Sequence, residues 1–215
     1  MIRLVIFDLD GTLLNTLQDL AECTNVVLRR HGFLEHHEDA YRYFVGNGIP
    51  TLIERALPDS FRTPEIIAQV LEDFMPYYNL HKADKTAPYT GIVELLETLQ
   101  QRNIAIAVAS NKTHSAMAPL LAHYFPTIKF AAFFGNRPQI PIKPHPQVVE
   151  DVLAQTGISK LETLYVGDTA VDMETAANAG LRKIGVLWGF REREELVSAG
   201  ADILIEKPDE ILNYL

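Results

Sequence analysis

The chain has 215 residues, with 19 Lys and Arg against 28 Asp and Glu, so its formal net charge is −9. This acidic balance argues against broad binding to nucleic acids or anionic membranes, which requires a basic face. The only cysteine, Cys23, excludes an intramolecular disulfide and a cysteine-based zinc cluster. No apolar run approaches the roughly 20 residues of a membrane span, and nothing at the N-terminus resembles a signal peptide. We therefore expect a cytoplasmic protein.

A single strand followed by a helical insert is predicted for the N-terminal part of the chain. The short apolar run at 4–7 predicts a buried strand. Amphipathic patterns then predict three helices, at 17–30, 49–57 and 64–78. Thr16 with Asp19 three residues later is typical of a capping box at the first helix. The next strand signal comes about 90 residues after the first, which is too far for one crossover helix, so we expect a small separate domain.

From residue 83 onward, short apolar runs alternate with helical patterns. The runs predict strands at 104–109, 130–134, 163–166, 184–187 and 202–205. The patterns predict helices at 91–101, 146–155, 170–179 and 208–215. Continuous apolar strands that alternate with helices are typical of a parallel sheet covered on both faces. The sequence therefore predicts an α/β fold, with a Rossmann-like parallel sheet core (1–14 and 83–215) and an inserted α-helical domain (15–82).

Polar side chains follow several of these strands, at the edge where parallel sheets bind ligands. They are Asp8 and Asp10, Ser110 and Asn111, Lys143, and Asp168 with Asp172. Four carboxylates against one lysine in a partly buried cleft are costly unless a cation neutralises them. Oxygen ligands without histidine or cysteine favour Mg²⁺. Such a cluster suits phosphoryl transfer, in which negative charge is carried by the transferred oxygens.

These segments resemble the four motifs of the haloacid dehalogenase superfamily. The motifs are Asp8-Leu9-Asp10-Gly11-Thr12-Leu13, Ser110-Asn111, Lys143-Pro144 and Gly167-Asp168-Thr169-Ala170-Val171-Asp172. They occur in the family's order, the resemblance covers essentially the whole chain, and the insert resembles the family's helical cap. The segments 81–91, 45–48 and 143–146 further resemble phosphoglycolate phosphatases. One departure is Asn15, where many relatives carry aspartate.

The resemblance implies roles for the four aspartates. Asp8 would be the nucleophile that forms an aspartyl-phosphate, and Asp10 would protonate the leaving oxygen and then activate water. Mg²⁺ would be held by the Asp8 side chain, the Asp10 backbone carbonyl and Asp168. Asp172 would orient the water shell of the metal; a plain surface role is its alternative.

The resemblance also implies a phosphate site. Ser110 and the Asn111 backbone would hold phosphate oxygens together with the amides of the next helix start, and Lys143 would bridge Asp8 and the phosphate. Ser110 could instead only cap that helix. The expected partner is a small soluble phosphate ester, with 2-phosphoglycolate as the best candidate, and the expected assembly is a monomer or a weak homodimer.

Alternatives remain for the insert and for the reaction. Gly46, Asn47, Gly48 and Arg55 are candidate substrate contacts of the cap, but the glycines could form only a turn and the arginine could be solvated. A phosphomutase similar to β-phosphoglucomutase and a pyrophosphatase share the same chemistry. A binding or scaffold protein on this fold is the non-enzyme alternative.

Overall fold

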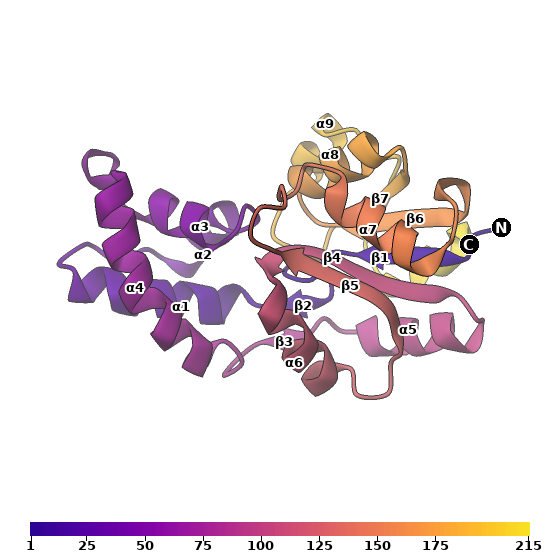
Figure 1. Ribbon diagram of the computed structural model, residues 1–215, viewed down its shortest axis with the longest axis horizontal. Helices are drawn as coiled ribbons and strands as arrows, with labels where there is room; N and C mark the ends of the chain where they lie inside the picture. The colour runs from indigo at the N-terminus through magenta and orange to yellow at the C-terminus, as the bar shows by residue number, and fades with distance from the viewer. The chain divides into compact units, whose positions relative to one another are not determined.

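The computed structural model describes residues 1–215, which divide into two compact units. One unit comprises Met1–Leu14 and Pro88–Leu215, and the other comprises Asn15–Ala87 (Figure 1). The chain passes from one unit to the other at two points, and both lie in a small two-stranded sheet formed by β2 (Leu14–Asn15) and β3 (Ala87–Pro88). We describe the first unit as the core and the second as the insert.

The core contains a six-stranded parallel sheet in the order β5-β4-β1-β6-β7-β8, which confirms the predicted fold class. The strands are β1 (Leu4–Phe7), β4 (Ala105–Thr113), β5 (Phe130–Asn136), β6 (Thr163–Gly167), β7 (Arg182–Val186) and β8 (Ile203–Ile205). In the register, Phe7 of β1 pairs with Val108 on one side and Val166 on the other. The carboxyl ends of these three strands therefore lie at one edge of the sheet.

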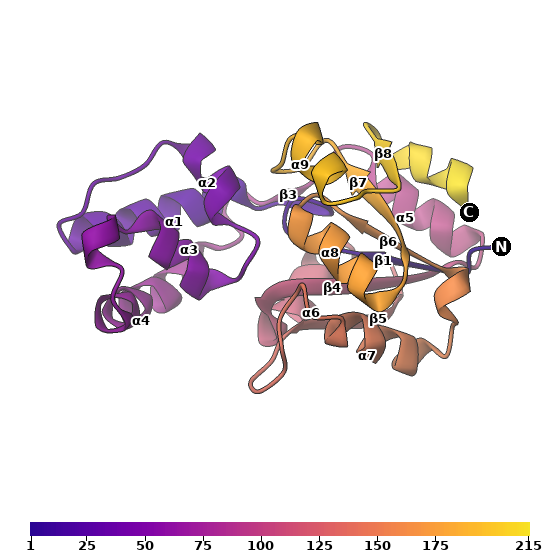
Figure 2. The same cartoon turned by 90° about the horizontal axis from the view of Figure 1, so that it is seen from above.

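Helices cover both faces of this sheet (Figure 1). The helices are α5 (Ile92–Gln101), α6 (His114–Tyr124), α7 (Gln147–Thr156), α8 (Ala170–Ala179), α9 (Arg193–Ser198) and the 3₁₀ segments η2 (Lys160–Glu162) and η3 (Pro208–Tyr214). Leu4 and Ile6 of β1 pack with α7 and α8, which contact each other over the sheet (Figure 2). Val5 and Phe7 pack with α5 and α6 on the opposite face. Every side chain of β1 is thus buried, as its unbroken apolar sequence predicts.

Two core helices have no counterpart among the sequence predictions. In α6, Pro119 lies inside the helix and apolar residues occur on several sides, so the sequence has no clear helical stripe. The six residues of α9 are too few to establish a period. β4 also runs further than predicted, to Thr113, so Ser110 and Asn111 are part of the strand.

The insert is entirely helical apart from its ends. Its helices are α1 (Leu17–Arg30), α2 (Glu38–Phe44), α3 (Ile49–Ala56), η1 (Asp59–Phe61) and α4 (Pro64–His81). The predicted capping box at α1 is wrong, because Thr16 makes no capping hydrogen bond. The Asp19 carboxylate instead accepts hydrogen bonds from the Lys85 and Thr86 amides and from the Thr86 hydroxyl. These bonds tie residues 83–87 to the insert. Across the chain, no helix is both long and apolar enough to cross a membrane.

Truncating a buried side chain of α5 should destabilise the core. Leu96 is fully buried, so we expect Leu96→Ala to lower the free energy of unfolding by about 2–5 kcal/mol. Urea denaturation followed by the fluorescence of Trp188, the only tryptophan of the chain, measures this loss in the core. Leu161 is 93% exposed, and Leu161→Ala should change the unfolding free energy by less than about 0.5 kcal/mol. Equal effects of the two variants would contradict the packing described here.

Candidate active site

Asp8 directly follows the central strand of the core. Its amide donates a hydrogen bond to the carbonyl of Val166 at 2.9 Å, which continues the pairing of β1 with β6. The turn beyond it depends on Gly11, whose φ of +91° is favourable only for glycine. The Asp8 side chain is buried, and its Oδ1 lies 2.8 Å from Nζ of Lys143. The buried sheet thus presents a carboxylate next to an ammonium group.

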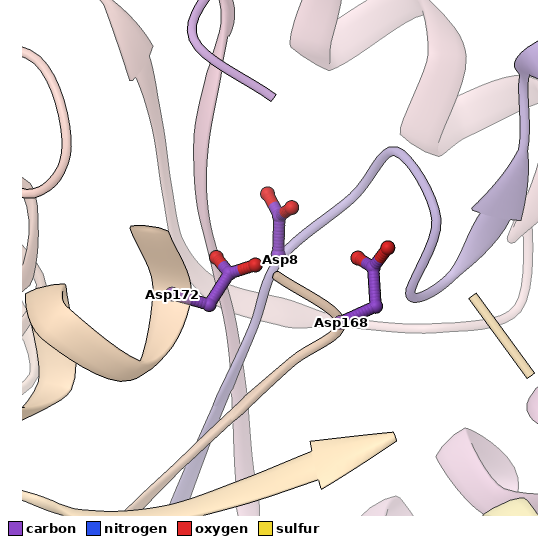
Figure 3. A group of neighbouring side chains, drawn as sticks. All are labelled: Asp8, Asp168 and Asp172. Carbon is purple, nitrogen blue, oxygen red and sulfur yellow. The ribbon is translucent and has the colours of Figure 1, made fainter. Parts of the chain in front are cut away.

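Three buried carboxylates gather at this edge of the sheet. Ligand atoms of Asp8, Asp168 and Asp172 lie within 4.8 Å of one another, and Figure 3 shows Asp8 between the other two. Burial, together with the charge of Asp172, raises the pKa of Asp8 to about 7, although Lys143 opposes this shift. Burial and the charges of Asp172 and Asp8 also raise the pKa of Asp168 well above its ordinary value. The cluster therefore carries more negative charge than its surroundings neutralise.

Both oxygens of Asp168 accept hydrogen bonds from neighbouring segments. The Thr12 hydroxyl donates to Oδ1 at 2.8 Å, and the Phe190 amide donates to Oδ2 at 2.9 Å. Each carboxylate oxygen can accept more than one bond, so these contacts orient the group without occupying all its lone pairs.

Asp172 is bound on both sides by protein groups. Its Oδ2 accepts hydrogen bonds from the amide and the hydroxyl of Thr169, and this capping box begins α8. Its Oδ1 accepts from Nζ of Lys143 at 2.7 Å and from the Tyr165 hydroxyl at 3.2 Å. Thr169 is therefore the N-cap of α8, and Asp172 holds the lysine in place.

Lys143 is the centre of a buried polar network. Besides Asp8 and Asp172, its Nζ contacts the carbonyl of Ala109 at 3.1 Å and the Tyr165 hydroxyl at 3.3 Å. Burial alone would lower the pKa of Lys143, but the charges of Asp172 and Asp8 outweigh it and hold this pKa well above its ordinary value. Lys143 therefore stays charged. Tyr165, in the middle of an apolar strand, carried no sequence signal for this role.

The two polar residues of β4 lie next to the lysine segment. Asn111 makes two hydrogen bonds with the backbone of Lys143: its Oδ1 accepts from the Lys143 amide at 2.9 Å, and its Nδ2 donates to the Lys143 carbonyl at 3.3 Å. Ser110 is buried, and its hydroxyl accepts a bond from the Lys112 amide at 3.2 Å. The Asn111 side chain thus fixes the position of Lys143. The sequence did not predict this role of the Asn111 side chain.

A second buried lysine accompanies Asp10. Nζ of Lys112 lies 2.9 Å from Oδ1 of Asp10, and the two side chains are 5% and 15% exposed. Lys112 is thus a second positive charge at the site beside Lys143, and the sequence did not predict it. The available signal for Lys112 was its place directly after Ser110 and Asn111.

The candidate residues of the insert form one local cluster. The guanidinium of Arg55 donates to the carbonyls of Tyr43 and Phe44 and to Oδ1 of Asn47. Gly46 and Gly48 both have positive φ, of +121° and +85°. Arg55 of α3 therefore holds the loop that contains the other three candidates, Gly46, Asn47 and Gly48.

The acidic cluster could hold a metal ion. Its donors are carboxylate oxygens only, which suits a hard divalent cation such as Mg²⁺. Asp8 Oδ1 is buried and makes no hydrogen bond of good geometry, although Lys143 is close to it. Asp8 and Asp168 thus have oxygen lone pairs left to coordinate a cation. The charge of that cation would relieve the repulsion within the cluster.

Removing the charge of Asp8 should stabilise the metal-free protein. Because the pKa of Asp8 is raised from 3.8 to about 7 in the folded state, wild-type stability should fall as pH rises between these values. We expect Asp8→Asn to have a Tm several degrees above wild type at about pH 8 in chelator, and a similar Tm at about pH 4. Differential scanning calorimetry measures both. A lower Tm for the variant at about pH 8 would contradict the repulsion described here.

Comparisons with known proteins agree with this geometry. Residues 5–186 match the family model described as haloacid dehalogenase-like hydrolase. Phosphoglycolate phosphatases of Haemophilus influenzae (strain 86-028NP) and Aquifex aeolicus (strain VF5) are each 30% identical to 99% of this chain, which covers 98% and 96% of their lengths.

Solved structures share the fold over nearly the full chain. A protein from Lactobacillus delbrueckii subsp. bulgaricus superposes with a TM-score of 0.94 at 29% identity, covering 99% of this chain and 97% of that one. A predicted phosphoglycolate phosphatase from Haemophilus somnus 129pt has a TM-score of 0.90 at 27% identity, with the same coverage. The expectation of an enzyme of the hydrolase class is confirmed, and the names of the relatives support phosphatase as its activity. The chain belongs to the haloacid dehalogenase-like hydrolases.

Proposed function

We propose that the chain is a Mg²⁺-dependent phosphomonoester hydrolase that acts through an aspartyl-phosphate on Asp8. The observation that carries the proposal is the Asp8 carboxylate itself, which is buried, 2.8 Å from the Lys143 ammonium and within 4.8 Å of Asp168. A nucleophilic carboxylate needs an adjacent positive charge that shields the incoming anion. Family membership supports hydrolysis as the overall reaction.

The residues have defined roles in this proposal. The Asp8 side chain, the Asp10 backbone carbonyl and Asp168 would hold Mg²⁺, and Asp172 would orient its water shell. When bound, this ion supplies positive charge that neutralises the phosphoryl oxygens. Lys143 adds positive charge beside Asp8 on the protein side, and its position is set by Asp172.

Two displacements complete the reaction. First, an Asp8 oxygen bonds to phosphorus while the ester oxygen leaves, and Asp10 donates a proton to that oxygen. Second, Asp10 takes a proton from a water molecule, which attacks the phosphorus and releases inorganic phosphate from Asp8. Ser110 and the Asn111 backbone hold phosphate oxygens during both steps.

The preferred substrate in this proposal is 2-phosphoglycolate, with the insert acting as a cap whose Gly46–Gly48 loop contacts the substrate. Two observations support an anionic leaving group. The relatives that match nearly the full chain are named phosphoglycolate phosphatases. In addition, Nζ of Lys112 lies 2.9 Å from the Asp10 carboxylate. Asp10 must reach the ester oxygen, and the carboxylate of 2-phosphoglycolate begins two bonds from that oxygen, within reach of the same ammonium.

Phosphate release from a panel of esters tests the proposed activity. The panel contains 2-phosphoglycolate, pyrophosphate, hexose phosphates and nucleotides, each assayed with Mg²⁺ and with chelator. We expect Mg²⁺-dependent release that is strongest from 2-phosphoglycolate. Asp8→Asn is the control, and it should abolish release while remaining folded. Full activity in chelator would refute the metal requirement, and persistent activity of the variant would refute Asp8 as the nucleophile.

The role of Lys112 is tested by comparing two esters that differ in the carboxylate. We expect Lys112→Met to lower the ratio of kcat/KM for 2-phosphoglycolate to that for ethyl phosphate by about 10- to 100-fold, the effect of losing one charge-assisted hydrogen bond. The ratio is informative because any disturbance of Asp10 affects both esters alike. Equal losses on the two esters would mean that Lys112 acts only through Asp10.

A further inference from the structure

The segment 187–190, here called the Trp188 loop, follows β7 and lies against the acidic cluster. It begins at Leu187, whose amide donates to the carbonyl of Ile205 at 3.0 Å, so its start is fixed to β8. It ends at Phe190, whose side chain is buried. Both ends of this short loop are therefore anchored in the core.

Trp188 connects the loop to the segment after β1. Its indole Nε1 donates a hydrogen bond to the carbonyl of Thr12 at 3.0 Å. The hydroxyl of the same Thr12 donates to Oδ1 of Asp168 at 2.8 Å. The indole thus fixes the residue that orients one oxygen of the Asp168 carboxylate.

Gly189 allows the loop to approach this carboxylate closely. A Cβ atom built on Gly189 would collide with the Cβ of Asp168, and it would lie 2.5 Å from the Gly11 carbonyl oxygen. Neither neighbour is the flexible end of a long side chain, so a methyl group here must displace the loop or the aspartate. The requirement for glycine is steric, since any side chain would occupy the space of the cluster.

Phe190 completes the contact from the other side. Its amide donates to Oδ2 of Asp168 at 2.9 Å. The two oxygens of Asp168 are therefore held by two different segments, the Thr12 turn and the Trp188 loop. Asp8 and Asp172 carry like charges within 4.8 Å and would otherwise favour rotation of Asp168 away from them.

We infer that the Trp188 loop is a positioning element that holds the Asp168 carboxylate in the orientation needed to bind a divalent cation together with Asp8. This inference rests on the proposed Mg²⁺ site. Groups that hydrogen-bond to a metal-binding carboxylate typically change metal affinity by 10- to 100-fold when they are removed. The loop itself makes no contact with the metal in this scheme, because it acts through Thr12 and through Asp168.

Calorimetric titration of Mg²⁺ into the metal-free full chain tests the inference without relying on turnover. We expect Trp188→Phe, which removes the indole donor but keeps an aromatic ring, to raise the Mg²⁺ Kd about 10-fold. Gly189→Ala should raise it further because of the collision with Asp168. The Tm of each variant is also measured by thermal unfolding in chelator. The Tm of Trp188→Phe should stay within a few degrees of the wild-type value.

Val152→Ala is the matched control, because Val152 of α7 is fully buried in the cluster on one face of the sheet, whereas Trp188 packs against the cluster on the other face. It should lower the Tm and leave the Mg²⁺ Kd unchanged at a temperature where the protein is folded. If Gly189→Ala does not fold, Trp188→Phe still decides the question. An unchanged Mg²⁺ Kd for Trp188→Phe would overturn the positioning role of the Trp188 loop but not the proposed metal site. Absence of Mg²⁺ uptake by the wild-type chain would overturn the proposed metal site, and this inference with it.

Discussion

Repulsion among buried carboxylates is the constraint on which the site depends. Asp8, Asp168 and Asp172 lie within 4.8 Å of one another, and burial deprives them of the water that would screen their charges. Lys143 neutralises part of this charge by contacting Asp8 and Asp172. The negative charge that Lys143 does not neutralise destabilises the metal-free fold and favours the binding of a cation. The repulsion that destabilises the metal-free fold at this edge of the sheet therefore increases the affinity for a cation. Active sites commonly lower stability in favour of function in this way.

The rest of the core makes such a cluster tolerable. β1 lies between β4 and β6, and all its side chains are apolar and buried, so the strand cannot shift to relieve the repulsion at its end. Hydrogen bonds then fix each aspartate separately. Thr12 and Phe190 hold Asp168, whereas Thr169 and Tyr165 hold Asp172. Because these donors come from different segments, the geometry of the cluster depends on the tertiary fold and not on any one motif.

This dependence explains what the sequence could and could not predict. The parallel sheet followed from apolar runs, whose positions match the strands closely, because burial on both faces leaves a direct pattern in the sequence. The aspartates were found because they follow those strands. The sequence did not predict the roles of Tyr165 and Trp188 in positioning the cluster. Tyr165 lies within one apolar strand and Trp188 follows another, and each reaches its hydrogen-bond partner only in the folded chain. The capping box at Thr16 failed because Asp19 accepts bonds from residues 66 and 67 positions further along the chain.

Asp19 shows which property separates a structural buried aspartate from a functional one. It is as buried as Asp8, but three donors from Lys85 and Thr86 converge on its carboxylate, and no other carboxylate joins it in a metal-binding group. Its charge is compensated by the fold, so it closes the insert at the point where the chain returns to the core. Asp8 has one ammonium neighbour and two carboxylate neighbours. An excess of acceptors over donors in a buried site requires a cation or a proton from outside, and this requirement distinguishes the acidic cluster from the other buried carboxylate of the chain.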